Sequence, residues 1–201
     1  MRILLIHGWG FDPALWAPLC AARPGHQWLT LDLGYFGPAR TELPPDLDLV
    51  AGHSFGCLWA MAHPGLAHVP LAAVGGFPRF SAAPDFPHGT PARVLERMLT
   101  RLDEAPGAVL RDFHARLGTA APPGEPVRER LRADLQLMLD LDLRGAPGRA
   151  PARACAAADD PLVPAALSRQ AYPGRLTLLP DGGHALPLTR TEALADWLVP
   201  G

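Results

Sequence analysis

Lysine is absent from this sequence, and all 18 of its basic residues are arginine. The 20 acidic residues outnumber them, which gives a formal net charge of −2. A general nucleic-acid binder needs a basic surface, so this balance argues against that class and we expect no nucleic-acid partner. We attribute the missing lysine to a GC-rich coding bias rather than to function.

Cysteine is also scarce. Cys20, Cys57 and Cys155 are widely spaced and form neither a Cys-x-x-Cys motif nor a Cys/His ligand pattern. This excludes a disulfide framework, and we expect free thiols in a reducing compartment. The histidines show no metal-ligand spacing, and there is no Gly-rich phosphate loop or dinucleotide fingerprint. We therefore expect no metal and no cofactor.

Long apolar runs are missing as well. The N-terminal run, residues 3–6, stops at His7 and is too short for a signal-peptide core or a membrane span. We expect a cytoplasmic protein with no membrane contact. What the chain does have is 201 residues, 48% of them hydrophobic, which is enough for one domain with its own core. We expect a monomer.

Short apolar runs alternate with helical patterns along most of the chain. The run at residues 3–6 is apolar on both faces, which is typical of a buried strand in a parallel sheet. The runs occupy residues 3–6, 28–33, 47–51, 69–74, 152–158 and 176–179. Only the connection at 38–46, which contains Pro44 and Pro45, is too proline-rich for a crossover helix. The pattern predicts a doubly wound α/β fold with about six mostly parallel strands.

The pattern changes to helix without strands between residues 81 and 145. Three apolar stripes at helical spacing run over 94–102, 109–117 and 127–138. A helical insertion between two α/β stretches is typical of a lid over an active site, although ordinary helix packing gives the same stripes. We therefore expect a core of residues 1–80 and 146–201 with a helical lid at 81–145.

Residues 52–56 read Gly-His-Ser-Phe-Gly and match the G-x-S-x-G motif. The motif lies between a predicted strand and a predicted helix, where a nucleophilic serine stands on a sharp, strained turn. Small residues on both sides let the strand and the helix approach each other closely. The pattern predicts Ser54 as a nucleophile, with an ordinary Gly-rich turn as the alternative.

A serine hydroxyl needs a base, and the base needs a carboxylate that orients it. His184 follows the predicted strand at 176–179 and is our candidate base. Asp159 and Asp160 follow the predicted strand at 152–158, and from spacing alone either could be the acid. The order Ser, Asp, His, each after a strand, is the order that this kind of fold requires.

Two backbone N–H groups complete the predicted site. An oxyanion hole takes one N–H from the residue after the nucleophile and one from the first strand–helix loop. Phe55 supplies the first, and Trp9 is placed for the second. The Trp9 indole itself could simply belong to the core.

These motifs together resemble the α/β-hydrolase superfamily. Within it they are most similar to the carboxylesterases that cleave pimeloyl-[acyl-carrier-protein] methyl ester in biotin synthesis. The features that carry this resemblance are His-Gly-Trp-Gly at 7–10, the segment 75–80 and the size of the lid. The resemblance covers nearly the whole chain and implies Asp160 as the acid and Trp9 and Phe55 as oxyanion donors.

The chain also departs from this family in three ways. It begins directly at what would be the third strand of the family, so we expect an N-terminally shortened fold. The helix between the second and third strands is reduced to a Pro-rich loop. His53 stands where the biotin enzymes have tryptophan before the nucleophile.

Arginines mark two of the predicted lid helices. Arg93, Arg97 and Arg101 recur every four residues, and a second group follows at Arg128, Arg130 and Arg132. Acyl carrier proteins are acidic, so the first group could contact one. A solvated polar face in which arginine replaces lysine would look the same.

The sequence therefore predicts a serine carboxylesterase that hydrolyses a carboxylic methyl ester through an acyl-enzyme, with pimeloyl-[acyl-carrier-protein] methyl ester as the leading substrate. A thioesterase, a lactonase or a C–C bond hydrolase would use the same triad. A ligand-binding protein that has lost turnover is the alternative from another class. Such a protein would not need Ser54, Asp160 and His184 together.

Overall fold

The computed structural model describes residues 1–146, 148 and 150–199, and its strands form a six-stranded sheet. The strands are β1 (Arg2–Ile6), β2 (Gln27–Leu31), β3 (Leu49–His53), β4 (Leu71–Val74), β5 (Arg153–Ala157) and β6 (Leu176–Leu179). Their order across the sheet is β2-β1-β3-β4-β5-β6, and all neighbouring pairs are parallel. The predicted fold class is confirmed.

Most of the predicted strands differ from the observed ones by one or two residues at their ends, and the third is displaced along the chain as a whole. The apolar pattern places the third strand at 47–51, whereas β3 begins at Leu49 and continues to His53. Pairing with β4 explains the extension, because Gly52 and His53 lie in register with Ala73 and Val74. A glycine and a histidine join the strand because their backbone groups are paired, which an apolar pattern does not reveal.

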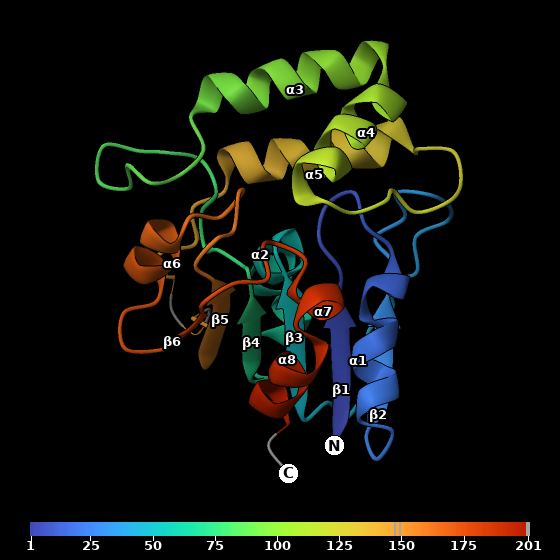
Figure 1. Cartoon of the computed structure of the whole chain (residues 1–201), viewed down its shortest axis with the longest axis vertical. Helices are drawn as coiled ribbons and strands as arrows, with labels where there is room; N and C mark the ends of the chain where they lie inside the picture. Colours follow the sequence, from blue (N-terminus) through green and yellow to red (C-terminus); the bar gives the residue numbers. More distant parts are fainter. Residues whose placement is uncertain (147, 149, 200–201) are drawn as a thin grey trace.

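Helices cover both faces of the sheet (Figure 1). One face packs against η1 (Pro13–Trp16), α1 (Ala17–Ala22), α7 (Leu186–Thr189) and α8 (Thr191–Leu198). The other packs against α2 (Phe55–Ala62), η2 (Pro64–Leu66) and α6 (Ala165–Ala171). Successive residues of β1 belong alternately to the two cores, which is why this strand is apolar on both faces. Among the described residues, no helix is both long and apolar enough to cross a bilayer.

Three helices lie beyond the carboxyl ends of the strands (Figure 1). They are α3 (Ala92–Glu104), α4 (Pro106–Leu117) and α5 (Arg128–Asp140), and they follow the three apolar stripes of the sequence. Pro106 occupies the first turn of α4, and Gly118 ends that helix in the left-handed conformation, with φ +65°. The exact division into core and lid at residues 81 and 145 stays a prediction.

Helix α5 is attached to the loop after β2 by polar contacts, the shortest of which is buried. The Tyr35 hydroxyl donates a 2.7 Å hydrogen bond to Asp134 Oδ2, and both side chains are buried. Burial raises the pKa of the Asp134 carboxyl above its ordinary value. Nearby, Arg130 Nε donates to Leu33 O at 3.1 Å, and the Val127 N–H donates to Tyr35 O at 2.8 Å. These bonds fix α5 to the loop that follows β2.

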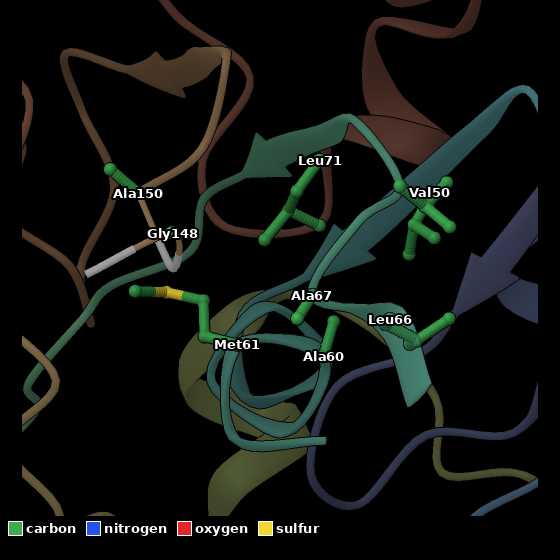
Figure 2. A pocket seen from close by; sticks show the side chains of 9 residues that line it. Val50, Ala60, Met61, Leu66, Ala67, Leu71, Gly148 and Ala150 are labelled. Atoms are coloured by element: carbon green, nitrogen blue, oxygen red, sulfur yellow. The ribbon is translucent and has the colours of Figure 1, made fainter. Parts of the chain in front are cut away.

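A small cavity lies beside the C-terminal half of α2, at the amino ends of β3 and β4 and away from the carboxyl ends of the strands. Figure 2 shows its apolar lining, to which Ala60 and Met61 of α2 contribute together with Val50 and Leu71 of β3 and β4. Its volume of about 20 Å³ is close to that of a single water molecule. A substrate pocket must therefore lie elsewhere.

We expect Tyr35→Phe to lower the free energy of unfolding by about 1–3 kcal/mol, because it leaves the buried Asp134 carboxylate without its donor. Urea denaturation at neutral pH measures the change. The control is the double variant Tyr35→Phe/Asp134→Leu, which removes both polar partners and should recover part of the loss. A single variant as stable as the wild type would show that the bond does not hold α5.

Candidate active site

Ser54 stands between β3 and α2 on a strained turn. Its backbone has φ +52° and ψ −121°, a conformation that non-glycine residues rarely adopt. The glycines on either side make room for it. A Cβ atom at Gly52 would lie 2.5 Å from Cys57 Cα, and one at Gly56 would lie 2.4 Å from Ile6 O. The G-x-S-x-G motif therefore reflects the close approach of α2 to β3 and β1.

His184 and Asp160 form a buried pair. His184 Nδ1 lies 2.7 Å from Asp160 Oδ2, and neither side chain is more than slightly exposed. An ionised carboxylate can only accept, so Nδ1 carries the proton. His184 Nε2 is also buried and makes no hydrogen bond among the described residues. In the neutral ring this nitrogen has a free lone pair, which is what a general base requires.

The Asp160 carboxylate is held in its ionised form. Burial alone would raise its pKa, but the charge of His184 and the hydrogen bond from its ring outweigh this effect. Oδ1 also accepts from the N–H groups of Val163 and Leu162, at 2.9 and 2.8 Å. The pKa of Asp160 therefore lies below its ordinary value. The loop after β5 supports the negative charge that faces His184.

The structure distinguishes the two adjacent aspartates. Asp160 contacts the imidazole, whereas Asp159 Oδ1 accepts a 2.8 Å hydrogen bond from the Gly183 N–H. Gly182 and Gly183 have φ values of +119° and +62°, so the turn before His184 is built from glycine conformations. Asp160 therefore binds the ring of His184, and Asp159 binds the backbone that carries it.

His53, the residue before Ser54, contacts the loop that carries His184. The two imidazole rings lie 4.8 Å apart between centroids, and His53 Nε2 lies 3.0 Å from His184 O. A carbonyl can only accept, so His53 Nε2 carries a proton. Burial, followed by the charge of His184, lowers the pKa of His53 to about 3. His53 therefore stays neutral and acts as a fixed hydrogen-bond donor.

The loop after β1 presents the Trp9 N–H. His7 Nδ1 lies 2.9 Å from Gly8 O, and the Phe11 N–H donates to the same oxygen at 3.2 Å. In a trans peptide the C=O and N–H point in opposite directions, so the Trp9 N–H is turned away from His7. Phe55 is the first residue of α2, where an N–H has no partner within the helix.

A pocket of about 400 Å³ opens between Ser54 and the helices above it. Trp9 and Ser54 line it from the sheet side. Its other walls are mostly apolar and come largely from α3, α4 and α5, namely Val94, Leu95, Met98, Val109, Phe113, Leu135 and Met138. Polar side chains, His88, Arg101, Asp112 and Arg116, also line it. The arrangement suits an apolar chain whose reactive end reaches Ser54.

The arginines of α3 and α5 differ in their partners. Arg101 pairs with Asp112 at 2.7 Å, Arg128 with Glu129 at 2.7 Å, and Arg132 with Asp103 at 3.0 Å. Arg93 and Arg97 are exposed on α3 and have no ion-pair partner among the described residues. Two of the three arginines of the first group are therefore available to a partner, and the third is already engaged.

Sequence reasoning missed three features of this site. Sequence patterns assign no role in the site to His53, His88 and His114, and the structure shows that His88 lines the pocket. His53 and His114 are buried and bind backbone oxygens of the two site loops. No local motif marks these contacts, because their partners lie more than 100 residues away. Within the described residues, no cluster of His, Cys, Asp and Glu side chains offers a metal site.

Comparison with known proteins identifies the family. No protein-family model matches the chain. It is 30% identical over 234 aligned positions to the pimeloyl-[acyl-carrier protein] methyl ester esterase of Stenotrophomonas maltophilia, covering 96% of this chain and 89% of the relative. The chain belongs to the pimeloyl-[acyl-carrier protein] methyl ester esterase family. The enzyme of that name from Aromatoleum aromaticum is 29% identical over 239 positions, covering 96% and 94% of the two chains.

Solved structures of other esterases share the fold. An esterase from Exiguobacterium antarcticum has a TM-score of 0.80 at 15% identity, covering 98% of this chain and 90% of its own. BioG from Haemophilus influenzae has a TM-score of 0.61 at 20% identity, covering 92% and 89%. The resemblance inferred from the motifs is confirmed. This esterase is a carboxylic ester hydrolase of the α/β-hydrolase type.

We expect Gly56→Ala to lower the free energy of unfolding by about 1–3 kcal/mol, because the new methyl group would overlap Ile6 O on β1. Chemical denaturation monitored by tryptophan fluorescence measures the loss. Gly25→Ala is the matched control, since Gly25 is exposed and a Cβ there meets nothing within 4 Å. If both variants were equally stable, the contact between α2 and β1 would not be as tight as described.

Proposed function

We propose that this esterase is a serine hydrolase with Ser54 as nucleophile, His184 as general base and Asp160 as the orienting acid. The observation that carries the proposal is the buried 2.7 Å pair of His184 and Asp160 beside the strained turn of Ser54. A buried imidazole with one nitrogen bound to a carboxylate and the other without a partner is poised to take a proton.

The first half-reaction acylates the serine. As Ser54 Oγ attacks the ester carbonyl carbon, its proton passes to His184 Nε2, and the carbonyl oxygen becomes an oxyanion. The N–H groups of Trp9 and Phe55 stabilise this charge. Asp160 keeps the ring in the required tautomer and stabilises the imidazolium. The carbon–oxygen bond to the leaving group then breaks, and His184 returns the proton to the departing methanol.

The second half-reaction releases the acid. Water attacks the acyl carbon while His184 Nε2 takes one of its protons. The resulting tetrahedral intermediate uses the same two N–H donors. It collapses when the bond to Ser54 Oγ breaks and the proton returns to that oxygen. The products are a carboxylic acid and the free enzyme, so no oxidant and no cofactor is required.

The substrate we propose is a pimeloyl methyl ester presented on an acyl carrier protein. The names of both full-length relatives support it. The mostly apolar pocket suits a methylene chain that enters between α3, α4 and α5 and reaches Ser54 with its ester end. In this proposal residues 81–145 act as the lid that surrounds the chain.

Arg93 and Arg97 are the residues we propose for contact with the acidic carrier. They are exposed, have no ion-pair partner in the part of the chain that the structure describes, and are close in sequence to Val94 and Met98, which line the pocket from α3. A positive pair at this place would steer an acidic partner toward the pocket. Arg101 contributes less, because Asp112 already occupies its guanidinium group.

Hydrolysis of pimeloyl-[acyl-carrier protein] methyl ester by purified enzyme tests the proposal, with free dimethyl pimelate measured beside it. We expect cleavage of the carrier-bound ester, and at least about a 10³-fold lower kcat in Ser54→Ala. Cleavage of the free ester alone would support the esterase activity but would exclude the carrier-bound ester as the substrate. Full activity of Ser54→Ala would exclude Ser54 as the nucleophile.

The double variant Arg93→Ala/Arg97→Ala should raise KM for the carrier-bound ester about 10-fold, because the steering charges are lost. Kinetics at two salt concentrations measure this, and the difference from the wild type should shrink at high salt. The KM for free dimethyl pimelate should be the same in the variant and the wild type. Arg128→Ala/Arg132→Ala is the charge-matched control, since both guanidinium groups are already paired. An equal KM increase in both double variants would rule out a specific contact through α3.

A further inference from the structure

Helix α4 reaches down to the loop after β1 with a buried histidine. His114 is 1% exposed, and its Nε2 lies 2.8 Å from Gly10 O, 104 residues away in the sequence. The carbonyl can only accept, so Nε2 carries the proton. His114 Nδ1 lies 2.8 Å from Thr119 Oγ1, whose hydroxyl can donate to it. The two contacts therefore define the neutral tautomer that donates to Gly10.

A line of peptide groups continues from this bond to the oxyanion site. The peptide that carries Gly10 O also carries the Phe11 N–H, which donates to Gly8 O at 3.2 Å. The peptide that carries Gly8 O also carries the Trp9 N–H. Each carbonyl that accepts a hydrogen bond polarises its own peptide, so hydrogen bonds in such a line strengthen one another. His114 is thus the donor at the start of a line that ends at the Trp9 N–H.

The packing of the loop agrees with this connection. Gly10 has φ +72°, and a Cβ atom there would lie 3.0 Å from Leu110 Cδ2 and 3.3 Å from Phe113, both on α4. The Trp9 indole N–H donates to Leu131 O of α5 at 2.8 Å. The oxyanion loop is therefore held from above by α4 and α5, as well as from below by His7.

We propose that His114 is a positioning residue for the oxyanion hole, which places and polarises the Trp9 N–H through the Gly10 and Phe11 peptides. The inference rests on the proposed role of Trp9 as an oxyanion donor. It assigns to the lid a part in the chemical step in addition to enclosing the substrate. It also makes the geometry of the hole depend on α4 keeping its place above the loop.

The test compares three substitutions of His114 that differ in reach. His114→Gln places an amide N–H near the position of Nε2 and keeps the bond to Gly10. His114→Asn places its amide near the position of Nδ1 and cannot reach Gly10. His114→Leu removes both polar atoms. Each variant is assayed with free dimethyl pimelate for kcat and KM, with an alkyl trifluoromethyl ketone for inhibition, and by thermal unfolding.

Removal of one direct oxyanion donor lowers kcat about 10²–10³-fold. His114 acts on such a donor only indirectly, so we expect kcat to fall about 10-fold in His114→Asn and His114→Leu. KM should change less than about twofold, because ground-state binding is not affected. The inhibition constant of the ketone should rise by the same factor as kcat falls, since its Ser54 adduct carries an oxyanion. In His114→Gln, both kcat and the inhibition constant of the ketone should be close to the wild-type values.

Two results would overturn the inference. One is a folded His114→Asn or His114→Leu variant with the kcat of the wild type. The other is a His114→Gln variant that loses as much activity as His114→Asn at the same unfolding temperature, because the bond to Gly10 would then be irrelevant. If His114→Leu does not fold, the comparison of His114→Gln with His114→Asn still tests the inference. By contrast, a Ser54→Ala variant that remained as active as the wild type would contradict the proposed function and not this inference alone.

Discussion

The turn at Ser54 is the constraint on which the rest of the site depends. A backbone with φ +52° at a serine costs about 1–3 kcal/mol, so the surroundings must enforce it. They do so by pairing β3 with β4 as far as His53, by a bond from the Ser54 N–H to Val74 O, and by the glycine contacts at residues 52 and 56. The same turn presents the side chain of Ser54 to the pocket and leaves the first N–H of α2 without a partner within the helix.

Three buried histidines hold the loops around this turn. His7 donates to Gly8 O, His53 to His184 O and His114 to Gly10 O, each at 2.8–3.0 Å. Each contact ends on a carbonyl oxygen, so the ring nitrogen involved must carry the proton. Burial lowers the pKa of His53 and of His114, so these two rings are neutral, rigid donors that add no charge beside the reacting groups. In this account His184 is the histidine that changes its protonation during the reaction.

Much of the fold could be predicted because local patterns determine it. Six short apolar runs that alternate with helical patterns predicted six mostly parallel strands, and β6 lies where expected, at Leu176–Leu179. The boundary of β3 could not be predicted, because Gly52 and His53 join the strand through backbone pairing, Gly52 with β1 and β4 and His53 with β4. The short helices α6 and α7, of seven and four residues, carry too little periodicity to be seen in a sequence.

In the candidate site, too, some residues could be predicted from local motifs and others depend on contacts between distant parts of the chain. Ser54 and His184 stand in local motifs whose glycines are visible in the sequence. Spacing alone could not separate Asp159 from Asp160, because only the direction of each side chain shows which one meets the imidazole. The contact of His114 with Gly10 joins residues that are 104 positions apart, and no local signal announces it.

The central claim, that Ser54 carries the acyl group between two half-reactions, is tested most directly by trapping the intermediate. The enzyme is mixed rapidly with excess p-nitrophenyl acetate, quenched in acid within the first turnovers and digested for mass spectrometry. We predict a burst of p-nitrophenol close to one per enzyme molecule, with an acetyl group on Ser54. Turnover with no burst and no acetylated Ser54, or an acetyl group on another residue, would contradict the account.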